Sequence, residues 1–143
     1  MVEAMVTLVV LAVGMLGIAG LYVTTLSSGG GAVDRMQAVN LAADLADRIR
    51  ANRTAKAAYA GAAANNNCIG AASVNCGPAV MAANDLLDWQ NQIAAVLPSG
   101  NGAVNVVAGA VPTDPYTYTI TISWLGTGDS AASPPSYVLT LQI

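Results

Sequence analysis

The chain has 143 residues, of which 55% are hydrophobic and 9% are charged, and its formal net charge is -3. A soluble domain averages about 25% charged residues, so this composition favours a surface that packs against other protein subunits. The negative balance argues against nucleic acid as the main partner, and the lack of histidine removes the commonest general base and metal ligand. The length allows one small globular core besides an apolar N-terminal stretch.

The N-terminal stretch MVEAMVTLVVLAVGMLGIAGLYV is almost wholly apolar. Roughly 20 apolar residues of helix cross a hydrocarbon core of about 30 Å, so a membrane-spanning helix is predicted over residues 1–26. Small residues at intervals of three would let another helix approach one face closely. These are Gly14, Gly17 and Gly20. The alternative is a generic signal anchor, in which small residues are simply common.

Glu3 is the single charged residue of this stretch. A secretory signal opens with Lys or Arg, so the sign of the charge is wrong for one. An acid at the centre of a span costs about 2.5 to 3.5 kcal/mol on insertion scales. We therefore expect Glu3 to meet a cation within an assembly of like helices; the alternative is a position at the headgroup interface.

Met-Val-Glu followed by about twenty apolar residues resembles the mature start of type IV pilins and pseudopilins. The resemblance implies a leader removed by a prepilin peptidase, and one or two mature residues before Met1. It also implies a methylated N-terminus. In that family the glutamate is thought to neutralise the N-terminal ammonium of a neighbouring subunit, and the resemblance gives Glu3 that role.

The segment SSGGG follows the apolar stretch, and its three adjacent glycines would cost an isolated helix about 3 kcal/mol. The resemblance to pilins suggests a hinge or melted step at Gly29, Gly30 and Gly31. An amphipathic helix is predicted over residues 32–56. Its expected apolar face comprises Val33, Met36, Val39 or Asn40, Ala43, Ala46 and Ile49, with Leu41 and Leu45 beside it.

Charged residues on this helix are spaced as intrahelical pairs, Asp44 with Arg48 and Asp47 with Arg50. The basic run continues to Lys56, where cations favour a helix C-terminus. The alternative, a DNA-binding patch, would rest on four basic residues with Tyr59 as the nearby aromatic.

The only cysteines, Cys68 and Cys76, lie in a loop over residues 65–77 that is rich in Gly, Asn and Ala. A disulfide there would stabilise the fold by roughly 2 to 3 kcal/mol and would imply a periplasmic or extracellular head. The alternatives are two free thiols in a cytoplasmic loop or a metal site, for which two cysteines supply half of a tetrahedral shell.

Pro78 is expected at the first turn of a second helix over residues 78–97. The expected apolar face of this helix comprises Ala82, Leu86, Trp89, Ile93 and Val96 or Leu97. Antiparallel strands are predicted within residues 103–143: a short one over 103–108, one over 116–124 in which YTYTITISW alternates cleanly, and one from Tyr137 to Ile143. One apolar face of this sheet should pack on the amphipathic helix.

The acids do not form a catalytic or metal-binding pattern. Asp114 and Asp129 lie in Pro- and Gly-rich loops and are expected to form turns, because no calcium-loop spacing is present. Asp85 and Asp88 are expected early in the second helix, where the dipole favours acids. We therefore expect a non-enzymatic chain without a cofactor, a metal or a small-molecule substrate.

The segments NLAADLADRIRANR, CGPAVMAANDLLDWQNQI and YTITISW together resemble the PilV class of type IV pilus minor pilins. The resemblance implies an α+β type IV pilin fold with a head over residues 27–143, first held in the inner membrane with its head in the periplasm. It further implies contacts with other minor pilins and the major pilin, in a complex that primes pilus assembly. The pilus tip is a candidate position for this complex. The resemblance also links the chain to cell adhesion and twitching motility. The alternatives are a minor pseudopilin of a type II secretion system and a membrane-anchored envelope binding protein.

Overall fold

The computed structural model describes residues 2–71, 73–111, 114–126 and 129–143, without the side chains of residues 26–29. Met1 of the predicted span, Ala72 of the predicted disulfide loop and residues 112–113 and 127–128 of the predicted connections lie outside the described residues. The chain divides into two compact units, Met1–Val33 and Asp34–Ile143. The second unit contains the globular head.

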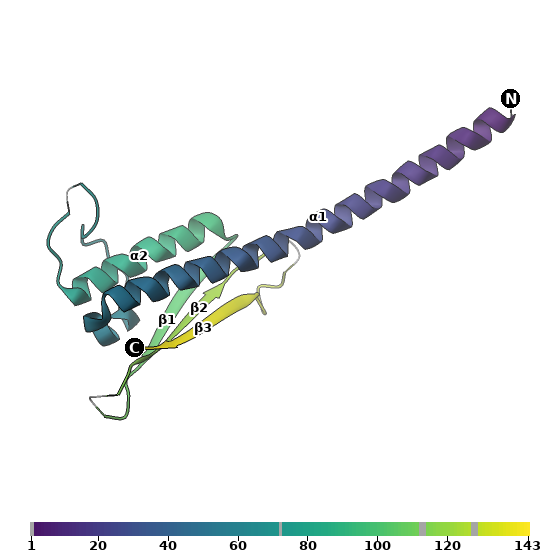
Figure 1. Cartoon of the computed structure of the whole chain (residues 1–143). Helices are drawn as coiled ribbons and strands as arrows, with labels where there is room; N and C mark the ends of the chain where they lie inside the picture. Colours follow the sequence, from purple (N-terminus) through teal and green to yellow (C-terminus); the bar gives the residue numbers. More distant parts are fainter. Residues whose placement is uncertain (1, 72, 112–113, 127–128) are drawn as a thin grey trace. The chain divides into compact units, whose positions relative to one another are not determined.

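A long helix opens the chain and two shorter helical segments follow it (Figure 1). Helix α1 spans Val2–Ala51, the 3-10 helix η1 spans Arg53–Ala60, and helix α2 spans Pro78–Val96. The strands are β1 (Asn101–Val107), β2 (Thr117–Ser123) and β3 (Ser136–Gln142). This is the predicted α+β arrangement of a long N-terminal helix, a second helix and a small antiparallel sheet, and it is consistent with the type IV pilin fold.

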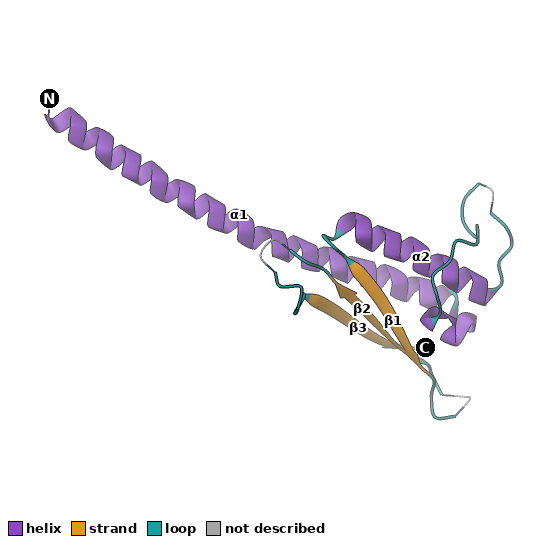
Figure 2. Cartoon of the chain, turned by 180° about the vertical axis from the view of Figure 1, so that it is seen from behind, coloured by secondary structure: helices purple, strands orange, loops and turns teal. Residues whose placement is uncertain are grey.

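The three strands form one antiparallel sheet in the order β1-β2-β3 (Figure 2). Ile120 of the central strand pairs with Val104 on one side and with Leu139 on the other. The alternation predicted for β2 is confirmed, because Tyr118, Ile120 and Ile122 are all buried on one face. That face is covered by the head part of α1 and by α2.

The core lies between the sheet and these helices. Trp89 of α2 is completely buried, and its Nε1 donates a hydrogen bond of 2.9 Å to the carbonyl oxygen of Leu41 in α1. The indole thereby ties the two helices together while its rings fill the core. The core residues are Ala38, Ala42, Leu45, Ala46, Ile49, Ala55, Tyr59, Ala82, Leu86, Trp89, Ile93, Leu97, Tyr118, Ile120, Ile122, Trp124 and Leu141.

The apolar face predicted for the amphipathic helix is wrong in its first half. Ala38 and Ala42 are fully buried, whereas Val33, Met36 and Val39 are 49%, 61% and 37% exposed. Ala43, also predicted on this face, is exposed as well. Small side chains on the inner face let the α1 backbone come close to α2 and the sheet, so the larger apolar side chains are left outside. The second half of the prediction, with Leu45, Ala46 and Ile49, is confirmed.

The amphipathic helix ends at Ala51 instead of residue 56. Asn52 leaves the helical region at φ -112° and ψ 41°, and Lys56 has a positive φ of 48°. The angles at Asn52 end α1, and those at Lys56 kink η1 between its two ends. Tyr59 in the second part of η1 is buried in the core. The sequence left open whether Val96 or Leu97 completes the apolar face of the second helix. Leu97 is 2% exposed and Val96 is 45% exposed, so Leu97 completes it.

Candidate assembly interface

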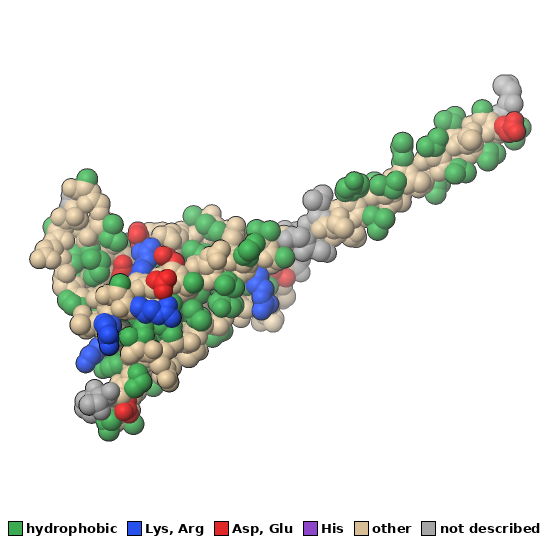
Figure 3. Space-filling model, in the orientation of Figure 1, with side chains coloured by type: hydrophobic (Ala, Val, Ile, Leu, Met, Phe, Trp, Pro, Cys, Tyr) green, Lys and Arg blue, Asp and Glu red, His purple; other side chains and the backbone are tan. Residues whose placement is uncertain are grey.

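Apolar side chains line the face of the first part of α1 that Figure 3 shows, and the large apolar side chains of this part are all exposed. It is long and apolar enough to cross a membrane, with a mean hydropathy of 2.4, and it is the one such helix among the residues described. Each of its large apolar side chains is between 56% and 76% exposed. They are Val2, Met5, Val6, Leu8, Val9, Val10, Leu11, Val13, Met15, Leu16, Ile18, Leu21, Tyr22 and Val23.

The threonine hydroxyls of this part of α1 are satisfied within the helix itself. Thr7 Oγ1 donates to the carbonyl oxygen of Glu3 at 2.7 Å, and Thr25 Oγ1 donates to that of Leu21 at 3.0 Å. Hydroxyls bonded back to the preceding turn need no water. These threonines thus meet the requirement that a lipid-exposed helix bond its polar groups internally.

Glu3 lies in the first turn of α1 and its side chain is exposed. An acid in the first turn is favoured by the positive end of the helix dipole. None of the described basic side chains forms an ion pair with it. A cationic partner for Glu3, as predicted from its position in the apolar stretch, would have to come from another chain or from a terminal ammonium.

The predicted helix-packing glycines have free space around them. A Cβ atom added at Gly14, Gly17 or Gly20 would meet no other atom of the chain within 4 Å. Packing within the chain therefore does not require these glycines, and their role in contact with another helix stays a prediction. Helix α1 runs through residues 29–31 without a break. The hinge at Gly29, Gly30 and Gly31 therefore also stays a prediction.

In the head, Arg48 joins α1 to α2 through several carboxylates. Its guanidinium lies 2.9 Å from Asp44, 3.7 Å from Asp85 and 3.6 Å from Asp88. The predicted pair of Asp44 with Arg48 is thus confirmed, and so is the pair of Asp47 with Arg50, at 2.7 Å. The basic run is engaged largely in structural pairs, and Lys56 lies 5.8 Å from the centre of the Tyr116 ring.

Asp85 was expected early in the second helix, where the dipole favours acids, but it lies beyond the first turn of α2 and is 6% exposed. Its Oδ2 accepts a hydrogen bond of 2.8 Å from the Tyr59 hydroxyl. Burial, followed by this hydrogen bond to Asp85, raises the pKa of Tyr59 well above its usual 10.0. Asp85 lines a shallow pocket of about 390 Å³ with Arg48, Asn52 and Cys76, but its carboxylate is held by Tyr59 and Arg48, so the pocket offers no free general base.

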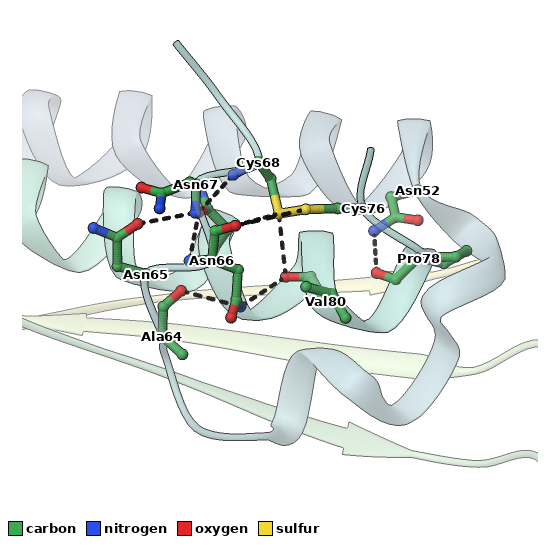
Figure 4. Close-up of a disulfide and its surroundings, with 10 residues drawn as sticks. Asn52, Ala64, Asn65, Asn66, Asn67, Cys68, Cys76, Pro78 and Val80 are labelled. Carbon is green, nitrogen blue, oxygen red and sulfur yellow. Dashed lines mark hydrogen bonds between the residues drawn. A yellow bond between two sulfur atoms is a disulfide. The ribbon is translucent and has the colours of Figure 1, made fainter. Parts of the chain in front are cut away.

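The loop over residues 65–77 is closed by a disulfide between Cys68 and Cys76, with their Cα atoms 5.7 Å apart (Figure 4). The predicted disulfide is confirmed, and both cysteines of the chain are used in it. The Nδ2 of Asn66 donates to the carbonyl oxygen of Val80 at 3.2 Å, which fixes the loop to α2.

Asn84 of α2 also holds this loop, and it is 7% exposed. Its Oδ1 accepts hydrogen bonds from the backbone N–H groups of Asn66, at 3.1 Å, and of Cys68, at 3.3 Å. The contacts of Asn84, Asp85 and Tyr59 were not predicted from the sequence. The signal that could have found them is the pairing of adjacent polar residues in α2 with an Asn-rich loop and a tyrosine just beyond the first helix.

Asp114 and Asp129 each bond back to the residue three positions earlier, as expected of turn-forming acids. Asp114 Oδ2 accepts a bond of 3.2 Å from the N–H of Val111, and Asp129 Oδ2 accepts one of 2.8 Å from that of Gly126. Among the described residues, no group of three or more acidic, Cys or His side chains could hold a metal ion.

A family model described as Tt1218-like, type IV pilin Tt1218, matches residues 20–87. The matched region runs from the apolar part of α1 through the disulfide loop into α2. No curated protein and no solved structure is significantly similar to the chain. The matched segment together with a 50-residue N-terminal helix and a three-stranded antiparallel sheet supports a place in the type IV pilin superfamily, whose members are structural subunits.

Proposed function

We propose that the chain is a minor pilin of the PilV class, held in the inner membrane by α1 before it joins a pilus. There it takes part in the minor-pilin complex that primes pilus assembly, and the pilus tip is its candidate position. The observation that carries the proposal is an apolar helical surface over residues 2–23 whose large side chains are each more than half exposed and which contains a single acid, Glu3.

A surface of this kind requires two environments in turn. Before assembly, lipid covers the apolar side chains of α1 and the head stands in the periplasm, where a disulfide such as Cys68–Cys76 persists. After processing by a prepilin peptidase, the same side chains are covered by the helices of other minor pilins and the major pilin. Gly14, Gly17 and Gly20 would let those helices approach closely.

Glu3 then sets the register between neighbouring helices. A carboxylate and a terminal ammonium 4 Å apart attract by about 4 kcal/mol at an effective dielectric constant near 20. Desolvation of both charges offsets part of this energy. The pair therefore favours one axial position of α1 among its neighbours, while the apolar surface supplies most of the affinity.

The test replaces Glu3 and follows assembly in the native host. Glu3→Ala and Glu3→Gln should leave membrane insertion intact and impair incorporation into pili, because both lack the negative charge. Glu3→Asp keeps the charge and serves as the matched control, with incorporation closer to that of the unmodified chain. Normal incorporation of Glu3→Gln would contradict the paired-charge role.

The partners are identified by crosslinking through Met36→Cys, since Met36 is 61% exposed on α1 in the head. Crosslinks to other minor pilins, together with loss of surface pili in a deletion strain, are expected. Crosslinks confined to subunits of a type II secretion system, with normal piliation, would instead identify a pseudopilin. Specific binding of a small ligand by the chain, with neither type of crosslink, would identify an envelope binding protein.

A further inference from the structure

Strand β3 lies at an edge of the sheet and pairs with β2 on one side only. Tyr116 and Ile143 exchange both of their backbone hydrogen bonds, at 2.8 and 3.0 Å. In an antiparallel pair such bonded positions alternate with non-bonded ones, so Tyr137, Leu139 and Leu141 also bond to β2. The residues between them turn their N–H and C=O groups away from the sheet. These are Ser136, Val138, Thr140 and Gln142.

The outward groups of β3 have no backbone partner in the described part of the chain. Natural edge strands are usually protected by charged residues, by proline or by a bulge. The seven residues SYVLTLQ include no charge and no proline, and their register with β2 runs without a bulge. This row of donors and acceptors fits an extended backbone.

The inner side of β3 is incompletely covered. Tyr137, Leu139 and Ile143 are only half-buried, whereas Ile120 and Ile122 of the central strand are fully buried. A further strand beside β3 would cover these half-buried side chains if it presented apolar side chains to the same face. A strand with apolar residues at alternate positions would therefore suit this edge.

The strand β3 of a second copy has this chemistry. In an antiparallel pair centred on Leu139, Val138 faces Thr140 of the second copy and Ser136 faces its Gln142. Every outward N–H and C=O group is then paired, while Tyr137 meets Leu141 on the apolar face. Two identical edges can approach because neither carries charge. The opposite edge is less available, since Gln90 Nε2 of α2 already donates to the Gly102 carbonyl oxygen, at 3.5 Å.

We propose that the heads of two copies associate through antiparallel β3–β3 pairing centred on Leu139, which joins their two sheets into one. This contact is independent of the assembly role proposed for α1. It places the outward-facing backbone of one β3 edge against that of the other, with Leu139 facing its own equivalent and Tyr137 facing Leu141 of the second copy.

The register is tested by mixing two full-length variants, Val138→Cys and Thr140→Cys, in detergent micelles under mild oxidation. These positions would be a hydrogen-bonded pair with Cα atoms about 5.5 Å apart, which lies within the roughly 4.4 to 6.8 Å that a disulfide spans. The mixture should form severalfold more crosslinked dimer than either variant alone. Val138→Cys mixed with Ser133→Cys, an exposed loop position, is the matched control. Equal crosslinking in all mixtures would show unspecific proximity and overturn the proposal.

A peptide with the sequence SYVLTLQI tests whether the backbone groups make the contact. The unmodified peptide should compete with crosslinking, and so should one N-methylated at the positions of Leu139 and Leu141, whose N–H groups would face away. N-methylation at the positions of Val138 and Thr140 should abolish competition. Equal competition by both methylated peptides would contradict strand pairing. Efficient crosslinking of Val138→Cys to another pilin, with none between copies, would assign the edge to that partner and overturn self-association.

Discussion

Two stretches of one helix behave oppositely. Over residues 2–23 of α1 the large apolar side chains are all more than half exposed, whereas over residues 38–49 a stripe of Ala and larger apolar residues is almost completely buried. The first stretch bonds the hydroxyl of Thr7 to its own backbone, and the second accepts a hydrogen bond from Trp89 of another helix. Secondary structure is the same in both, so the difference lies in where each stretch finds its contacts.

The consequence is a division of energetic roles. The stretch over residues 38–49 contributes to the free energy of unfolding of the head, because its contacts are present in the single chain. The stretch over residues 2–23 contributes only when lipid or another chain covers it. Substitutions in one stretch should therefore leave the property governed by the other unchanged.

The largest expected effect is that of Trp89→Ala, which empties the centre of the head core. Removing a fully buried aromatic side chain costs about 3 to 5 kcal/mol of unfolding free energy. The measurement is denaturant unfolding in detergent, followed by the fluorescence of Trp124, the other tryptophan of the chain.

Leu8→Ala is the matched control for Trp89→Ala, because Leu8 is 68% exposed in the first stretch. It should leave the unfolding midpoint of the head unchanged and weaken association between chains. A loss of head stability in Leu8→Ala comparable to that in Trp89→Ala would break the division between the two stretches.

Reduction of the Cys68–Cys76 disulfide should have the next largest effect. The bond closes a loop with a sequence separation of 8, so its loss should lower the unfolding free energy by roughly 2 to 3 kcal/mol. The loss is measured by unfolding with and without a reductant. A double Cys68→Ser, Cys76→Ser variant should be insensitive to the reductant, and membrane insertion through α1 should be the same in all samples. An unchanged midpoint on reduction would show that Asn66 and Asn84 hold the loop without the disulfide.

The sequence predicted the elements whose pattern is local. The alternation of YTYTITISW, the Pro-initiated helix α2 and the apolar stretch were all found where expected, because each depends on a period within a few residues. The inner face of α1 in the head was mispredicted because Ala38 and Ala42 were outranked by larger apolar neighbours. Which face is buried depends there on close approach to α2 and the sheet, and that distance is not encoded in hydrophobicity. The contacts of Asp85 and Asn84 join segments 16 to 26 residues apart, beyond the reach of any helical period.

Replacing a glycine in the head and one in the first stretch tests the same division, with a smaller expected change in the unfolding free energy. A Cβ at Gly102 would lie 2.6 Å from Cη2 and Cζ3 of the buried Trp89 ring, so Gly102→Ala should overpack the core and cost about 1 to 3 kcal/mol. Gly17→Ala meets nothing of the chain within 4 Å and should leave head unfolding unchanged. If Gly17 lines a contact between helices, Gly17→Ala should weaken crosslinking between chains. Head destabilisation by Gly17→Ala, or none by Gly102→Ala, would contradict these assignments.

The smallest effect concerns alkaline pH and the head alone. Burial raises the pKa of Tyr59 and of Tyr118 above the usual 10.0. Well below pH 10 both tyrosines are neutral in the folded and unfolded states, so their contribution is constant. Above pH 10 the unfolded chain loses tyrosine protons that the folded head retains, so stability should fall, by up to about 1.4 kcal/mol per pH unit for each such group.

Urea unfolding at pH 9, 10 and 11 measures this slope, and Tyr59→Phe should make it shallower by removing one of the two groups. Tyr59→Phe also lowers stability at pH 7, because Asp85 loses its hydrogen bond of 2.8 Å from the hydroxyl. The change in slope separates titration from this constant loss, since a lost bond alone lowers the curve equally at every pH. An identical slope in both proteins would mean that Tyr59 titrates in the folded head as it does in the unfolded chain, and that its contact with Asp85 does not persist in solution.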